Sequence, residues 1–99
     1  REWAVDLIQF GIRSNAIIIA ESFTPAYDEW LKTLPDGESV LKKISKSIPF
    51  EARMTKADEI ADTALFVVSD RSSHTTGQFI VVDGGYIHLD RALINDVDL

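Results

Sequence analysis

The sequence contains no cysteine, which excludes disulfide bonds and thiolate metal ligands and is compatible with a reducing compartment. Long apolar runs are missing as well. The longest, Ala16–Ala20 and Ala64–Val68, are far shorter than the roughly 20 residues that a membrane-spanning helix needs. No basic stretch followed by an apolar one opens the chain, so no leader peptide is predicted. From these absences we expect a cytoplasmic protein without a membrane partner.

Positive charge is also scarce. Ten Lys and Arg residues face sixteen Asp and Glu residues, giving a formal net charge of −6. The densest basic group is Lys42, Lys43 and Lys46, which is too small for the positive surface that nucleic acid binding requires. His74 and His88 have no acidic or histidine partner at metal-ligand spacing. We therefore predict neither a nucleic-acid partner nor a metal site.

The residues that are present describe an ordinary globular chain. Hydrophobic residues make up 45% and charged residues 26% of its 99 residues, enough for one small domain or for part of a larger one. Apolar residues at helical spacing predict a helix over residues 1–10 that ends at Gly11. The consecutive residues Ile17, Ile18 and Ile19 predict a strand that is buried on both faces, as in a parallel sheet.

The remaining pattern completes a β-α-β unit. Proline and glycine interrupt residues 21–50, which predicts short helices over residues 26–34 and 38–47. Thr55 followed by Asp58 predicts the start of a longer helix. Its apolar stripe is expected to lie on a sheet and consists of Ala57, Ile60, Ala61, Ala64, Leu65 and Val68. Residues 78–82 predict a second buried strand. The predicted fold class is α/β, with two parallel strands and flanking helices.

Glycines bracket the second strand, which raises the question of a phosphate-binding loop. Such a loop needs closely spaced glycines between a strand and a helix whose N-terminus faces the phosphate. Here Gly77 precedes the strand, and Gly84 and Gly85 are followed by Tyr-Ile-His-Leu rather than by a capped helix. We predict that these glycines only turn the chain and that Asp83 bonds the backbone of its own turn.

Two parallel strands form a marginal fold by themselves. A buried strand at residues 17–19 needs a neighbour on each edge, and residues 78–82 supply only one of the two. Arg1 also opens the first helical pattern without a capping residue. We therefore expect a fragment whose missing part lies on the N-terminal side.

Two segments carry a family resemblance. Residues 53–85 read RMTKADEIADTALFVVSDRSSHTTGQFIVVDGG, and residues 10–25 read FGIRSNAIIIAESFTP. Together they resemble the C-terminal part of the short-chain dehydrogenase/reductase family. The tail GGYIHLDRAL is similar to that of members acting on sugars such as fucose. The resemblance implies a doubly wound, Rossmann-like parallel sheet and divides the chain into a helix end and strand (1–24), a substrate loop (25–50), and a last helix, last strand and tail (51–99).

The resemblance also says which chemistry is absent. The family's glycine-rich phosphate loop, catalytic serine and Tyr-x-x-x-Lys motif precede the part that this chain matches. Tyr27 is followed four residues later by Leu31, and Tyr86 by Asp90, so neither begins such a motif. No catalytic residue is assigned, and NAD or NADP is expected as the cofactor of the complete parent enzyme.

The site residues that the resemblance implies lie after the first strand. Thr24 matches the threonine whose hydroxyl holds the nicotinamide carboxamide. Ser22 matches a position whose backbone contributes to that contact, and Ala20 replaces the glycine of the family's Pro-Gly pair. For the Thr24-Pro25 pair a simple helix start is the alternative. We place Glu21 and Trp30 at the substrate, with a solvated carboxylate and a core or subunit-contact residue, respectively, as the alternatives.

Two functions of different class follow. In the first, the chain is the C-terminal portion of an NAD(P)-dependent oxidoreductase acting on alcohols or sugars, and it supplies the nicotinamide-side wall, the substrate loop and an oligomer surface. Its partners are then the missing N-terminal half and other copies of the chain, with Phe79 and residues 87–93 as homo-oligomer contacts. In the second, it is a non-catalytic truncated homologue that self-associates or docks on a relative through the open strand edge.

Trp3, Phe50 and Phe66 are expected in the core or at a subunit contact.

Overall fold

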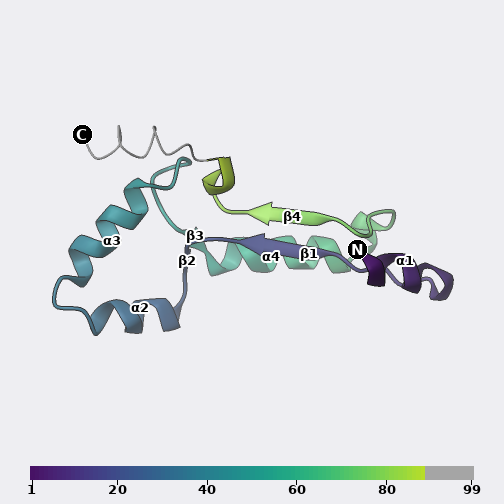
Figure 1. The fold of residues 1–99 in the computed structure, drawn as a ribbon, viewed down its shortest axis with the longest axis horizontal. Coiled ribbons are helices and arrows are strands. Elements are labelled where there is room, and N and C mark those ends of the chain that lie inside the picture. Colours follow the sequence, from purple (N-terminus) through teal and green to yellow (C-terminus); the bar gives the residue numbers. More distant parts are fainter. Residues whose placement is uncertain (89–99) are drawn as a thin grey trace. The chain divides into compact units, whose positions relative to one another are not determined.

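In the computed structural model, residues 1–88 are described, and they form two compact units (Figure 1). The first unit comprises residues 1–19 and 58–82. Its parallel strands β1 (Ala16–Ile19) and β4 (Phe79–Val82) lie side by side, in a register that pairs Ala16 with Phe79 and Ile19 with Val82. The predicted parallel β-α-β connection is thereby confirmed.

Helices of the first unit begin and end close to where the sequence predicts. Helix α1 (Glu2–Leu7) continues into the 3-10 helix η1 (Ile8–Phe10), and Gly11 ends it with a left-handed φ of 69°. Helix α4 (Ala57–Val68) is followed by η2 (Asp70–Ser72). The predicted start at Thr55 is two residues too early, because Thr55 and Lys56 form strand β3 and the helix begins at Ala57.

Burial in the first unit differs from the prediction. Ile18 and Ile19 are 39% and 49% exposed, so the expected burial of β1 on both faces is wrong for this chain. The physical reason is that β1 pairs only with β4 within residues 1–88. Leu65 and Val68 on the α4 stripe are 67% and 74% exposed. Trp3 and Phe66 of this unit, and Phe50 of the second unit, are exposed rather than in a core, and their alternative role at a subunit contact stays a prediction.

The second unit comprises residues 20–57 and the described residues 83–88. Helices α2 (Pro25–Lys32) and α3 (Gly37–Lys46) confirm the two predicted short helices. The unit also contains an unpredicted parallel pair, β2 (Ser22–Phe23) with β3 (Thr55–Lys56). Its strands are two residues long, too short for a periodic pattern to reveal them.

A small apolar core holds the second unit together, formed by Leu31, Ile48 and Met54. The α2–α3 hairpin is tight: a Cβ at Gly37 would overlap the backbone carbonyl of Leu31. Gly84 has a φ of 62° and lies against Ile48, so a side chain there would be both strained and crowded. These contacts explain why glycine occupies positions 37 and 84.

The turn after β4 confirms the prediction for Asp83. The Asp83 carboxylate accepts hydrogen bonds from the backbone N–H groups of Gly85 (2.9 Å) and Ile87 (2.8 Å), as expected for a turn that bonds its own backbone. A short 3-10 helix, η3 (Tyr86–His88), follows the turn. Gly77 has a φ of 72° and turns the chain before β4 as predicted. The tail from residue 89 onward, with most of the predicted oligomer contact, lies outside the described residues.

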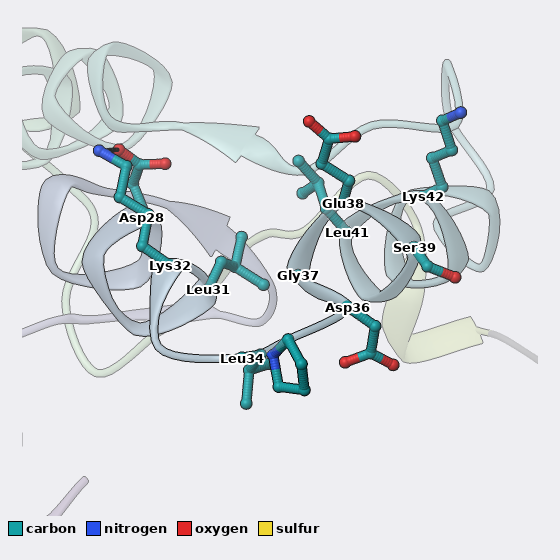
Figure 2. A pocket seen from close by; sticks show the side chains of 11 residues that line it. Asp28, Leu31, Lys32, Leu34, Asp36, Gly37, Glu38, Ser39, Leu41 and Lys42 are labelled. Carbon is teal, nitrogen blue, oxygen red and sulfur yellow. Dashed lines mark ion pairs between the residues drawn. The ribbon is translucent and has the colours of Figure 1, made fainter.

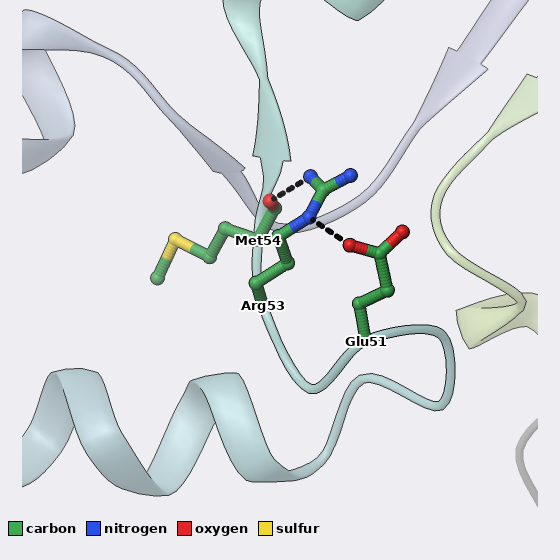
Figure 3. Close-up of polar contacts among 3 residues, drawn as sticks. All are labelled: Glu51, Arg53 and Met54. Carbon is green, nitrogen blue, oxygen red and sulfur yellow. Dashed lines mark hydrogen bonds and ion pairs between the residues drawn. The ribbon is translucent and has the colours of Figure 1, made fainter.

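The turn that leads into β3 contains the strained part of the backbone. Glu51 and Ala52 have φ values of 64° and 49°, a left-handed conformation that side chains disfavour. Figure 3 shows how the turn is fastened: the Arg53 guanidinium donates to the Glu51 carboxylate at 3.1 Å and to the Met54 carbonyl at 3.1 Å. Phe50 adds a backbone bond to the carbonyl of Gly84. The turn is therefore held by contacts on both sides of the strained residues.

Candidate functional site

Apart from Trp30 on α2, the predicted site residues lie in one short segment, residues 20–24, which follows β1 in the chain. In parallel α/β folds, ligands bind beyond the carboxyl ends of the strands, which is where such a segment begins. Its backbone is fixed by β3: the Thr55 N–H donates to the Glu21 carbonyl at 3.1 Å, and Ser22 pairs with Thr55 in the ladder. Because Thr55 is itself buried, the strand that pairs with this segment is packed in the interior of the unit.

Thr24 caps helix α2. Its backbone is extended, and its Oγ1 accepts the Tyr27 N–H at 3.2 Å, with Pro25 at the first helical position. The helix-start interpretation of Thr24-Pro25 is therefore confirmed. It leaves room for a second role, because a threonine hydroxyl has one proton and two lone pairs. The cap occupies one lone pair, and no acceptor within residues 1–88 takes the proton.

Ser22 and Ala20 offer backbone rather than side-chain groups. The Ser22 side chain is buried, and its hydroxyl donates back to the Ala20 carbonyl at 3.3 Å. Ala20 does not have a positive φ, so its methyl group imposes no left-handed strain where the family has glycine. The predicted contribution of Ser22 through its backbone fits this arrangement.

Glu21 and Trp30 meet at a residue that was not predicted to belong to the site. The Tyr27 hydroxyl donates to Glu21 Oε2 at 2.9 Å. The Tyr27 ring is edge-on to the Trp30 ring, with centroids 5.4 Å apart, and tilted against Phe23 at 6.5 Å. Burial, followed by the hydrogen bond and the negative charge of Glu21, raises the pKa of Tyr27 to about 12.

Three of the predicted side chains are thus brought together through Tyr27. Glu21 bonds its hydroxyl, Thr24 accepts its backbone N–H, and Trp30 packs on its ring. The sequence does carry a signal for this. Tyr27 and Trp30 are three residues apart, the spacing of neighbours on one helix face, whereas Phe23 precedes the helix in β2. The absence of a lysine four residues after Tyr27 excludes only a Tyr-x-x-x-Lys motif and carries no information on this packing.

A separate cavity of about 720 Å³ opens between α2 and α3 (Figure 2). Leu31, Leu34 and Leu41 supply its apolar part, and the Lys32–Asp28 ion pair (3.1 Å) lies at its edge. None of the predicted site residues lines it. This cavity therefore does not contain the predicted site residues.

Two further findings concern residues 1–88 only. Their His, Asp and Glu side chains form no group of three or more that could hold a metal ion. Within the same residues, no helix is both long and apolar enough to cross a membrane.

Comparison with known proteins decides the family. The family model described as Enoyl-(Acyl carrier protein) reductase matches residues 1–87. Dehydrogenase/reductase SDR family member 6 of Aquarana catesbeiana is 34% identical over 83 residues, which are 84% of this chain and 34% of that protein. The chain belongs to the short-chain dehydrogenase/reductase family. The resemblance predicted from residues 10–25 and 53–85 is thereby confirmed.

Two other members of the family are similar to this chain. The enoyl-[acyl-carrier-protein] reductase [NADH] FabI of Bacillus cereus is 41% identical over 83 residues, covering 84% of this chain and 30% of the relative. The crystal structure of Cj0485 dehydrogenase has a TM-score of 0.88 and 49% identity, covering 93% of this chain and 35% of that one. The Rossmann-like fold class is therefore confirmed. The chain corresponds to the C-terminal part of its relatives and spans about a third of their length.

Proposed function

We propose that this chain is the C-terminal portion of an NAD(P)-dependent oxidoreductase acting on alcohols or sugars. In the proposal, residues 20–24 form the nicotinamide-side wall and residues 25–50 the substrate loop. The observation that carries it is the Thr24 hydroxyl, which caps α2 with one lone pair and keeps its proton for another partner. The name of the Bacillus cereus relative specifies NADH, which supports a nicotinamide cofactor for this chain.

Thr24 suits a carboxamide because an amide offers both a carbonyl acceptor and an N–H donor. The free proton of Oγ1 matches the carbonyl, and its second lone pair matches the amide N–H. The backbone of Ser22, held in the β2–β3 ladder, lies two residues away. The bound nicotinamide would supply hydride transfer, while these residues would fix the orientation of its amide.

The proposal assigns the acid–base step to residues outside this sequence. Neither Tyr27 nor Tyr86 is followed by a lysine four residues later. A tyrosine acid/base needs a nearby cation to lower its pKa, whereas burial and Glu21 raise the pKa of Tyr27. Tyr27 is therefore unsuited to that step, and we expect no hydride transfer from the 99-residue chain alone.

Thr24 substitutions in the full-length protein that carries this chain test the cofactor role. Thr24→Ala should raise KM for NAD(P) about 5- to 30-fold, the effect of losing one hydrogen bond of about 1–2 kcal/mol. It also removes a helix cap, so Thr24→Asp serves as the second variant: a carboxylate caps the helix but has no proton for the carboxamide.

The controls separate cofactor binding from helix stability. Thr24→Ser should retain both the cap and the contact. Thr33→Ala removes an exposed hydroxyl at the other end of α2, where it bonds the Trp30 carbonyl at 2.6 Å. If Thr24→Ala and Thr24→Asp both keep the wild-type KM for NAD and NADP, Thr24 does not hold the cofactor.

The second candidate function is self-association without catalysis, and the exposed apolar side chains of the first unit favour it. Phe79 is 58% exposed on β4, and Phe10 in η1 is 68% exposed. Sedimentation equilibrium of the 99-residue chain is the test. Concentration-dependent dimers weakened by Phe79→Ser would support this function, whereas a monomer that unfolds cooperatively would remove it. Ile87, 60% exposed, is the other described residue proposed for oligomer contact.

A further inference from the structure

Tyr27 makes contacts that helix packing alone does not require. Its hydroxyl extends from α2 to a carboxylate six residues earlier in the chain, on the segment before β2. The bond joins the start of the proposed substrate loop to the proposed cofactor wall. The Tyr27 ring is partly buried and contacts the rings of Phe23 and Trp30. These contacts restrict the position of the hydroxyl.

The hydrogen bond from Tyr27 occupies only one of the two oxygens of the Glu21 carboxylate. Oε2 accepts the phenolic proton at 2.9 Å, and no other hydrogen bond to this carboxylate occurs within residues 1–88. Oε1 therefore keeps its lone pairs, and the phenolic oxygen, its proton donated, can still accept. The pair presents only acceptors, and the ligand groups that such a pair recognises are hydroxyl or amine donors.

We infer that Tyr27 is a positioning residue that holds Glu21 so that its free oxygen accepts a hydrogen bond from a substrate hydroxyl other than the one that is oxidised. The inference rests on the proposed function, and it narrows the substrate class to compounds with at least two hydroxyl groups. Without the phenol, Glu21 is a partly exposed side chain with several rotatable bonds, and fixing it on a ligand costs conformational entropy.

Trp30 belongs to the same arrangement. Its ring is 48% exposed, and its contact with Tyr27 is edge-on. An exposed indole beside a fixed acceptor is suited to the C–H face of a polyol, because aromatic rings cover apolar surface at little entropic cost. The hydroxyl and the ring of Tyr27 thus support Glu21 and Trp30 together.

A double-mutant cycle in the full-length protein tests this role. Tyr27→Phe keeps the ring and should raise KM for a vicinal diol, cyclohexane-1,2-diol, about tenfold, the effect of one hydrogen bond to a charged group. The kcat and the KM for NAD(P) should stay unchanged. KM for cyclohexanol, which has no second hydroxyl, should also stay unchanged. In a Glu21→Ala background the same substitution should have no effect on KM for the diol, because no carboxylate remains to be held.

The outcomes separate the possible roles. If Tyr27→Phe raises KM equally with and without Glu21, or equally for both alcohols, Tyr27 is merely structural and the inference fails. Tyr86→Phe is the matched control, because it also removes one phenol and should leave KM for the diol unchanged. Glu21→Gln keeps an acceptor for Tyr27 and should lie between wild type and Glu21→Ala. If the wild-type protein oxidises neither alcohol with NAD or NADP, the proposed function fails and this inference fails with it.

Discussion

Arg13 should contribute more to the stability of this chain than any other charged side chain among the described residues. Its Nη1 donates to the carbonyls of Val67 (3.0 Å) and Thr75 (3.1 Å) and to Ser72 Oγ (3.1 Å). Its Nη2 donates to the Ser69 carbonyl at 3.1 Å. These acceptors lie at and just beyond the C-terminal end of α4, where helix carbonyls have no partner in the helix and the helix dipole attracts a cation.

The cost of Arg13→Met can be worked out from these bonds. A single hydrogen bond to a charged group contributes about 1.5–3 kcal/mol, but four bonds from one half-buried guanidinium do not add, and water can reach part of the vacated site. We therefore expect a loss of about 3 kcal/mol in the free energy of unfolding. Arg13→Lys keeps the charge and at most three donors without the planar fork, so it should lose about half as much.

Urea denaturation followed by circular dichroism measures both variants. The free energy of unfolding follows from the midpoint and slope, and an unchanged slope shows that the unfolded states are comparable. Arg71→Met is the matched control, because Arg71 is exposed in the adjacent η2 and its loss should cost less than about 0.5 kcal/mol. If Arg13→Met costs no more than Arg71→Met, the reasoning about the end of α4 is wrong.

Two further predictions concern the second unit. Ala52→Gly should raise the free energy of unfolding by about 0.5–1 kcal/mol, because its φ of 49° suits glycine; a lower urea midpoint would show that the turn is not strained. Tyr27 should make stability depend on alkaline pH: its folded pKa, about 12, lies above the ordinary 10.0, so its contribution is complete below pH 10.0 and is lost as pH rises toward 12. The urea midpoint of wild type should therefore fall further between pH 9.5 and 11 than that of Tyr27→Phe, and equal falls would contradict the shift.

The sequence predicts those elements that depend on neighbours along the chain. Helices α2 and α3, the turn at Gly77 and the Asp83 turn all follow from capping, glycine and side-chain chemistry within a few residues.

What the sequence does not predict depends on distant partners. The β2–β3 pair joins residues more than thirty positions apart, and two-residue strands have no period to detect. Arg13 lies 54 residues from Val67, and nothing in its local pattern indicates a helix end as its partner. The consecutive residues Ile17–Ile19 predict that β1 is buried, yet exposure depends on which elements cover a strand, and residues 1–88 supply one neighbouring strand.

The site and the exposed apolar surface differ in whether their stabilising partners are local. The side-chain hydrogen bonds that arrange Glu21, Thr24 and Tyr27 close within seven residues, and the β2–β3 ladder that supports them lies in the same unit. The apolar side chains of β1, α4 and β4 have no such local partners and gain stability only from a covering surface. Substitutions at Thr24 and Tyr27 should therefore change ligand binding with little effect on assembly. Substitutions at Phe79 should do the opposite, and the two sets of variants can be assayed independently.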